Sequence, residues 1–195
     1  MADGFWRYWN TGKEYGLAGK CILIVGGVRS GKSDYAQKLA LKRSGKVLFV
    51  ATAEALDEEM RSRIEAHRKA RPPGWRTLEL TRGLGNGIAK HLDSEVVIID
   101  CLTLMVSNLV GRGGNAEEAR RRVEREIRSL LKCIDGTQAT FVIVSNEVGL
   151  GLVPDNPLGR LYRDLIGEAN QSVARRADEV YFMVAGIPYK LKGKT

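Results

Sequence analysis

One glycine-rich segment, residues 26–33, constrains the fold of this chain more than any other feature. It reads Gly-Gly-Val-Arg-Ser-Gly-Lys-Ser and directly follows the apolar run 21–25. It fits the pattern G-x-x-x-x-G-K-[ST], whose backbone N–H groups converge on phosphate oxygens, with a lysine charge and a serine hydroxyl that can ligate magnesium. A helical pattern follows, so a helix N-terminus would face the same anion. The sequence therefore predicts strand, phosphate loop and helix, and a nucleoside triphosphate bound by Gly26, Gly27, Val28, Arg29, Ser30, Gly31, Lys32 and Ser33.

Short apolar runs alternate with helical patterns along the rest of the chain. Nearly continuous apolar strands separated by helices are typical of a mainly parallel sheet with helices on both faces. A short segment after Pro188 can return as an antiparallel edge strand, which completes an α/β fold. Strands are predicted at 21–25, 46–51, 76–80, 96–100, 140–145, 179–184 and 189–191, and helices at 32–43, 56–70, 84–92, 102–110, 116–133 and 158–177.

Length and composition bound the organisation of the chain. Its 195 residues and 44% hydrophobic content suffice for one well-buried domain, expected over residues 21–195, after a poorly ordered extension over residues 1–20. Cys21, Cys101 and Cys133 lie in or beside apolar segments, which is typical of reduced thiols rather than disulfides or a metal site. No apolar run approaches the roughly 20 residues of a membrane span, and no signal peptide is evident. These features predict a soluble cytoplasmic protein.

The formal net charge of +8 raises the alternative of a nucleic-acid-binding protein. The densest basic groups, residues 120–122 and 175–176, lie in helical patterns that also carry acidic residues, as solvated helix faces do. No basic run is interleaved with aromatic residues, and no nucleic-acid motif is present. We therefore expect no nucleic acid among the partners, and the surplus charge can attract anionic small substrates.

Polar residues at the carboxyl ends of the predicted strands are the next candidates, because ligands bind at this edge of a parallel sheet. Asp100 follows a buried strand and, with Ser33, fits the pair of oxygen ligands that holds magnesium; alternatively, it caps the next helix. Glu79 ends a weaker strand and could be a second carboxylate near the metal or substrate, or an exposed strand end. Asn146 and Glu147 open a glycine-rich loop beside the expected phosphate site, although such a loop can also be only a turn.

The two histidines differ in their surroundings. His91 ends a short polar helix and is expected at the surface. His67 falls on the inner, apolar stripe of its helix together with Met60 and Ile64, and three cations follow within four residues. An imidazole in that position can attack a nucleotide α-phosphate. Spacing alone favours a partly buried structural histidine over this catalytic one.

Between residues 22 and 192 the chain resembles the bifunctional adenosylcobinamide kinase/adenosylcobinamide-phosphate guanylyltransferases of cobalamin biosynthesis. The most specific motifs are Asp57-Glu58-Glu59-Met60, which leads to His67-Arg68 and Arg71-Pro72, and the segment Asn146-Glu147-Val148-Gly149. The others follow in the family's order: the phosphate loop, Ala51-Thr52-Ala53, Trp75-Arg76-Thr77, Asp100-Cys101-Leu102-Thr103, Val153-Pro154, Arg163-Asp164 and Asn170-Gln171. The first 20 residues fall outside the resemblance.

The resemblance implies a RecA-like P-loop NTPase fold, a homotrimer, and two reactions that use magnesium, ATP and GTP. A nucleoside triphosphate phosphorylates adenosylcobinamide, and GMP from GTP is then transferred to adenosylcobinamide phosphate, which gives adenosylcobinamide-GDP. His67 would carry GMP as a covalent intermediate, and Lys32, Ser33 and Asp100 would neutralise charge during phosphoryl transfer. Asp100 stands where the family often has glutamate, which is one methylene longer. Implied GTP contacts beyond the phosphate loop are Ala51, Thr52, Ala53, Arg68, Lys69, Ala70, Arg71, Glu79 and Asp100.

Two other enzyme classes share part of this pattern. A simple P-loop small-molecule kinase needs Lys32 and Asp100 but has no use for a nucleophilic His67. A RecA-like nucleic-acid-stimulated ATPase would use the basic charge, and its binding to DNA would weaken steeply as salt rises.

Overall fold

The computed structural model describes residues 19–55, 57–69 and 71–193, so most of the expected N-terminal extension lies outside the described residues. Its strands are β1 (Cys21–Gly26), β2 (Val47–Ala51), β3 (Arg76–Glu79), β4 (Val96–Asp100), β5 (Thr140–Asn146), β6 (Glu179–Val184) and β7 (Ile187–Lys192). Its helices are α1 (Lys32–Leu41), α2 (Glu58–Lys69), α3 (Leu84–Lys90), α4 (Leu102–Val110), α5 (Ala116–Asp135) and α6 (Pro157–Arg176). Every boundary lies within two residues of its predicted position.

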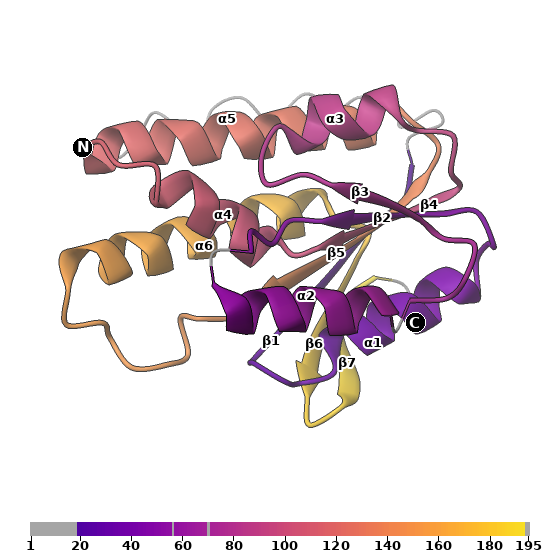
Figure 1. Ribbon diagram of the computed structural model, residues 1–195, viewed down its shortest axis with the longest axis horizontal. Helices are drawn as coiled ribbons and strands as arrows, with labels where there is room; N and C mark the ends of the chain where they lie inside the picture. The colour runs from indigo at the N-terminus through magenta and orange to yellow at the C-terminus, as the bar shows by residue number, and fades with distance from the viewer. Residues whose placement is uncertain (1–18, 56, 70, 194–195) are drawn as a thin grey trace.

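A single seven-stranded sheet forms the centre of the molecule, in the order β3-β2-β4-β5-β1-β6-β7 (Figure 1). The first six strands are parallel, and β7 returns antiparallel to β6 at one edge. The return passes through Ala185 and Gly186, which both have positive φ (49° and 83°), the conformation that a tight two-residue hairpin turn requires. The predicted mainly parallel sheet with an antiparallel edge strand is confirmed.

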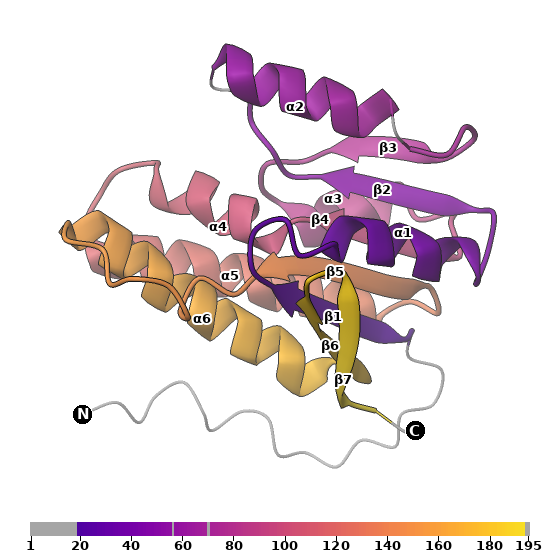
Figure 2. The same cartoon turned by 90° about the horizontal axis from the view of Figure 1, so that it is seen from below.

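Helices cover both faces of the sheet, as predicted. Helices α3 to α6 lie on one face and α1 lies on the other, while α2 flanks the edge strand β3 (Figures 1 and 2). Alternate residues of each central strand enter the two cores: Leu23 and Val97 face the α3–α6 side, and Ile24 and Ile98 face the α1 side. Both faces of each strand are therefore apolar, which is why the strands read as continuous apolar runs in the sequence.

The three cysteines are buried or half-buried, as predicted from the apolar segments around them. Cys21 and Cys101 are buried and Cys133 is half-buried. Burial raises the pKa of the Cys21 thiol to about 12 and that of the Cys101 thiol to about 11, which keeps both protonated at neutral pH.

Within the described part of the chain, no helix has the length and apolar character needed to cross a membrane.

The prediction that residues 175–176 belong to a solvated helix face is wrong for Arg176. Its side chain is only 5% exposed, its Nε donates to Asp135 Oδ1 (2.5 Å), and its Nη1 lies 3.6 Å from Asp178 Oδ2. Its Nη2 donates to the carbonyl of Gly19 (3.2 Å), and Asp178 accepts the Cys21 N–H (2.7 Å). The end of α6 is thereby joined to the start of β1, a long-range contact that the local charge pattern does not reveal.

Replacing Arg176 by methionine is expected to lower the free energy of unfolding by about 2–3 kcal/mol, because the Asp135 carboxylate and the Gly19 carbonyl lose a donor and Asp178 loses a nearby positive charge. The loss falls at the low end for buried pairs, since Asp135 and Asp178 are 40% and 48% exposed. Urea denaturation measures it. Arg121→Met is the matched control, since Arg121 is 58% exposed and forms an ion pair with Glu117 on its own helix. Equal losses in the two variants would contradict the role of Arg176.

Candidate active site

The phosphate loop connects β1 to α1 as predicted. Gly26 ends the strand, and α1 begins at Lys32 with Gly31 as its N-cap and no side-chain cap on its first N–H groups. Glycine is required at two positions: Gly31 has φ 88°, and a Cβ at Gly26 would come within 2.6 Å of the Met183 carbonyl oxygen. Without a side-chain cap among the described residues, the first N–H groups of α1 can donate to an anion at the carboxyl edge of the sheet.

Lys32 lies inside this loop and is only 7% exposed. Its Nζ donates to the Gly27 carbonyl oxygen and, at 3.4 Å, to Ser30 Oγ. Burial lowers the pKa of the Lys32 ammonium, while the nearby Cys101 and Asp100 act in the opposite direction. The loop thus holds a positive charge where phosphate groups would enter.

Asp100 ends β4 next to Ser33 at the start of α1. Burial raises the pKa of the Asp100 carboxyl, and a hydrogen bond with the Ser33 side chain and the charges of His67, Arg71 and Lys32 partly offset that rise. Cys101, and not Asp100, is the N-cap residue of α4, so the helix-capping alternative is wrong. The structure brings the two predicted metal ligands together.

Thr52 follows β2 and is fully buried. Its hydroxyl donates to the Cys101 carbonyl oxygen (2.7 Å) and accepts the Cys101 N–H (2.8 Å), while its own N–H donates to the Asp100 carbonyl oxygen (3.2 Å). Its carbonyl oxygen accepts from Asn108 Nδ2 (2.8 Å). All its polar groups have protein partners, so Thr52 holds the end of β4 in place.

Arg71 lies between the strand-end carboxylates and the α1 face of the sheet. Its guanidinium stacks over the Phe49 ring at 3.9 Å, and its Nη1 donates to Thr77 Oγ1 (3.1 Å). Burial lowers the pKa of Arg71, whereas Asp100 and Glu79 raise it. Its buried Nε has no hydrogen-bond partner within the described ranges. Arg71 is therefore poised to donate to an anion beside Asp100.

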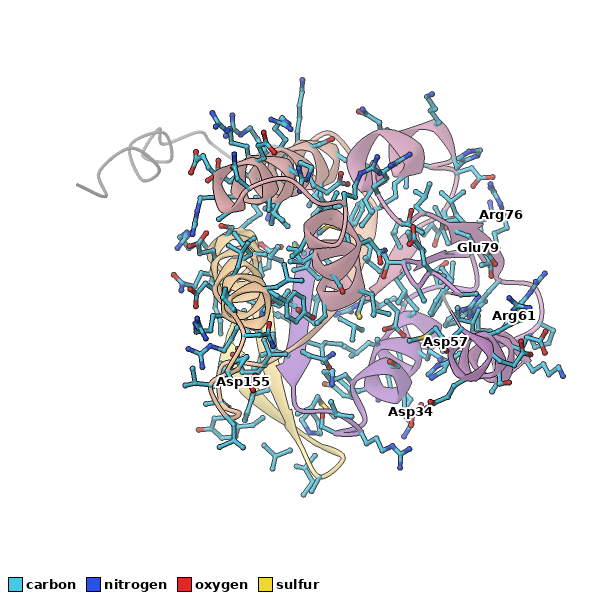
Figure 3. The ribbon with its side chains drawn as sticks, turned by 60° about the vertical axis from the view of Figure 1, so that its left-hand side comes forward. Asp34, Asp57, Arg61, Arg76, Glu79 and Asp155 are labelled. Atoms are coloured by element: carbon cyan, nitrogen blue, oxygen red, sulfur yellow. The ribbon has the colours of Figure 1, made fainter. Side chains whose placement is uncertain are left out.

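Glu79 ends β3 at the same edge of the sheet. In the sheet register Ala51 pairs with Glu79 on one side and with Asp100 on the other. The Glu79 side chain is exposed, and it lies on the β3 side of the molecule (Figure 3). Ala51 is buried and Ala53 half-buried, and the sheet register places Ala51 between the ends of the strands that carry Glu79 and Asp100.

His67 lies near the end of α2 and is exposed, which corrects the expectation that it faces the inside of the protein with Met60 and Ile64. Those two residues are half-buried, but α2 flanks the edge strand β3 and does not lie across the sheet (Figure 2), so its apolar stripe covers little. The charge of His67 acts to lower the pKa of the Asp100 carboxyl. Arg68 and Lys69 are also exposed, and Ala70 lies outside the described residues. His91, the C-cap of α3, is exposed as predicted.

Residues 22–191 match the family of cobinamide kinase / cobinamide phosphate guanyltransferase. The chain belongs to this family. It is 41% identical over 180 residues to the bifunctional adenosylcobalamin biosynthesis protein CobU of Escherichia coli (strain K12), a match that covers 88% of this chain and 99% of that protein. It is 40% identical over 173 residues to the bifunctional adenosylcobalamin biosynthesis protein CobP of Pseudomonas aeruginosa, with 88% and 97% covered. The family predicted from the sequence motifs is confirmed.

Two solved structures resemble the fold of this family member at low identity. The flagellar accessory protein FlaH from Methanocaldococcus jannaschii has a TM-score of 0.47 and 15% identity over 91% of this chain and 80% of its own. The RadB recombinase has a TM-score of 0.47 and 16% identity over 85% and 74%. In this chain the phosphate-loop strand β1 lies between β5 and β6.

In this kinase/guanylyltransferase chain the strand ends are supported by polar residues whose roles the sequence did not reveal. Asn108 of α4 donates from Nδ2 to the carbonyl oxygens of Thr52 (2.8 Å) and Thr81 (3.3 Å). Asn170 of α6 lies in the buried polar layer under the end of β5, where it contacts Ser145. Asn170 belongs to a quoted family motif, but no local spacing signals Asn108.

Proposed function

We propose that this protein phosphorylates adenosylcobinamide with a nucleoside triphosphate and then transfers GMP from GTP to adenosylcobinamide phosphate. The observation that carries this function is the family match over residues 22–191, which includes an intact phosphate loop. Neither a kinase without guanylyl transfer nor a nucleic-acid-stimulated ATPase gains support from that match.

For the kinase half, Ser33 and Asp100 would hold Mg²⁺. Their oxygen atoms suit this hard cation, and a bound cation would add to the positive charges that already favour the ionised Asp100 carboxylate against the effect of burial. A bound magnesium ion neutralises charge on the phosphates of ATP or GTP. Lys32 would bind the same phosphates and stabilise the transferring group, which is most of what a phosphoryl-transfer site must do.

For the guanylyltransferase half, His67 would act as the nucleophile. An imidazole nitrogen attacks the α-phosphorus of GTP, an N–P bond forms, and the bond to the pyrophosphate oxygen breaks. A phosphate oxygen of adenosylcobinamide phosphate then attacks the same phosphorus and releases the histidine. The buried, unpartnered Nε of Arg71 and the exposed Arg68 and Lys69 would bind the phosphates of GTP, with further contacts at residues 51–53 and Glu79.

Two assays of the wild-type protein test this function. Incubation with adenosylcobinamide, magnesium and ATP or GTP should give adenosylcobinamide phosphate, detected by mass spectrometry. Incubation with magnesium and GTP labelled at the α-phosphate should leave a covalent label on the protein. Product without label would reduce the enzyme to a simple kinase, and label without product would leave only the transferase.

The family resemblance also implies a homotrimer, which the exposed apolar side chains of this chain support. Ile187, Tyr189 and Leu191 are 69%, 67% and 59% exposed on the edge strand β7. We expect light scattering in dilute solution to give three times the chain mass of 21.5 kDa. A monomer across micromolar concentrations would contradict this prediction. The expected cytoplasmic location remains a prediction.

A further inference from the structure

The end of β5 lies between the two halves of the phosphate site. In the sheet, β5 separates β4, which carries Asp100, from β1, which leads into the phosphate loop. Asn146 is in register with Gly26, and the Glu147 N–H donates to the Gly26 carbonyl oxygen (3.0 Å). Because a phosphate-loop lysine reaches the β- and γ-phosphates, and β5 lies between the strand that ends at Asp100 and the strand that leads into the phosphate loop, the γ-phosphate is expected above the end of β5.

The backbone at this point is fixed by buried side chains on the α3–α6 side. The Asn146 N–H donates to Thr103 Oγ1 (2.6 Å), and the Asn146 carbonyl oxygen accepts from Asn170 Nδ2 (3.1 Å). Asn170 in turn accepts from Ser145 Oγ (2.6 Å). Together with the contact to Gly26, these bonds hold the start of the following loop as a rigid support for a functional side chain.

Glu147 directly follows Asn146 and carries a carboxylate on this rigid segment. It is half-buried, and its Oε1 accepts the Gly149 N–H (3.2 Å). A Cβ at residue 149 would lie 3.0 Å from that oxygen, so glycine allows the close approach. Across the described ranges, no other hydrogen bond or ion pair to the Glu147 side chain is found. Residues 149–153 are all exposed, which leaves a large acceptor free to approach.

The other carboxylates near the phosphate loop are less suited to the acceptor. Asp100 is engaged with Ser33. Glu79 ends β3, and β2, β4 and β5 separate that strand from β1. Of the carboxylates of Asp100, Glu79 and Glu147, only that of Glu147 follows β5, the strand next to β1. One of its two oxygen atoms accepts the Gly149 N–H, and the other remains available to a ligand.

We propose that Glu147 is a catalytic residue of the kinase step and receives the proton of the acceptor alcohol. This inference rests on the proposed function. As the alcohol oxygen attacks the γ-phosphorus, a new O–P bond forms and the bond from the γ-phosphorus to the bridging oxygen breaks. The nucleoside diphosphate leaves with that electron pair. The alcohol proton passes to the Glu147 carboxylate and then to water.

The variant Glu147→Gln tests the assignment, because its amide oxygen can still accept the Gly149 N–H but cannot take a proton. We expect kcat of the kinase step to fall by about 10²–10⁴-fold, the usual contribution of a general base, with little change in KM for the nucleotide. GMP labelling from GTP should match that of the wild type. Glu147→Asp keeps a base on a side chain one methylene shorter and should show an intermediate kcat.

The matched control is Asp155→Asn, which removes a carboxylate from an exposed position of the same loop (Figure 3) and should leave both reactions unchanged. A wild-type kcat in Glu147→Gln would overturn the inference. Joint loss of phosphorylation and labelling would also overturn it, because it would indicate a structural role. Failure of the wild-type protein to phosphorylate adenosylcobinamide would instead refute the proposed kinase function itself, and this inference with it.

Discussion

His67→Ala is expected to abolish covalent labelling by GTP and to reduce guanylyl transfer by roughly 10³-fold or more, because loss of a covalent nucleophile removes the intermediate itself. Phosphorylation of adenosylcobinamide should largely persist, since we propose that γ-phosphoryl transfer uses Lys32, Ser33 and Asp100, and this reaction needs no covalent step. The His67 side chain is exposed, so the substitution should leave the fold intact. The two activities are measured on the same preparation with labelled GTP and with adenosylcobinamide plus ATP.

The chemistry of the label provides an independent check. A histidine phosphoramidate is labile in acid and stable in base, whereas a serine or threonine phosphodiester survives mild acid. His91→Ala is the matched control, because His91 is the other histidine of the chain, is exposed, and caps α3. An acid-labile label that survives in His67→Ala and disappears in His91→Ala would move the nucleophile to α3. Equal loss of both activities in His67→Ala would argue against separate roles for the loop and the histidine.

Much of the fold could be predicted because its determinants are local in the sequence. The central strands carry apolar residues toward both cores, as Leu23 and Ile24 do, so each strand is a continuous apolar run. The phosphate loop needs positive φ at Gly31 and close backbone approach at Gly26, so glycines mark it directly. Asn115 and Glu118 form a capping box, which explains the sharp start of the long helix α5.

The features that could not be predicted depend on where whole elements pack. Arg176 lies in a mixed-charge stretch that is typical of solvent, yet the end of α6 meets the start of β1 and buries it. His67 shares an apolar stripe with Ile64, yet α2 lies at the edge of the sheet, where that stripe finds little to cover (Figure 2). Asn108 supports two strand ends at once, and only the assembled sheet brings those carbonyl groups together.

The sequence motifs predict which residues belong to the site but not what each of them does. The structure shows that residues of these motifs differ in whether their polar groups already have protein partners. Thr52 lies in a motif expected to touch GTP, but its polar groups are paired with Asp100, Cys101 and Asn108. Arg71, from the following helix motif, keeps a buried Nε without a partner among the described residues. A motif therefore contains both residues that can bind the ligand and residues that hold the binding groups in place.

Lys32→Ala should stop both reactions, because each begins with a nucleoside triphosphate in the same loop. We expect kcat of the kinase step to fall by about 10³-fold or more, since the ammonium stabilises charge that develops on the transferring group. GMP labelling should fall as well, which distinguishes this variant from Glu147→Gln and from His67→Ala. Lys38→Ala is the matched control, since Lys38 is exposed on the same helix. An unchanged kcat in Lys32→Ala would refute the assignment of the phosphate loop.

The fold should survive this substitution. Burial lowers the pKa of Lys32, so the charged ammonium destabilises the folded protein. This loss in the free energy of unfolding grows as the pH falls below the ordinary pKa of lysine. Alanine removes that cost together with the bonds to Gly27 and Ser30, two effects of opposite sign. Without nucleotide, the Tm of Lys32→Ala should therefore stay close to that of the wild type at neutral pH. With magnesium and GTP, the Tm of the wild type should rise while that of the variant should not, because only the protein that binds the ligand gains stability from it.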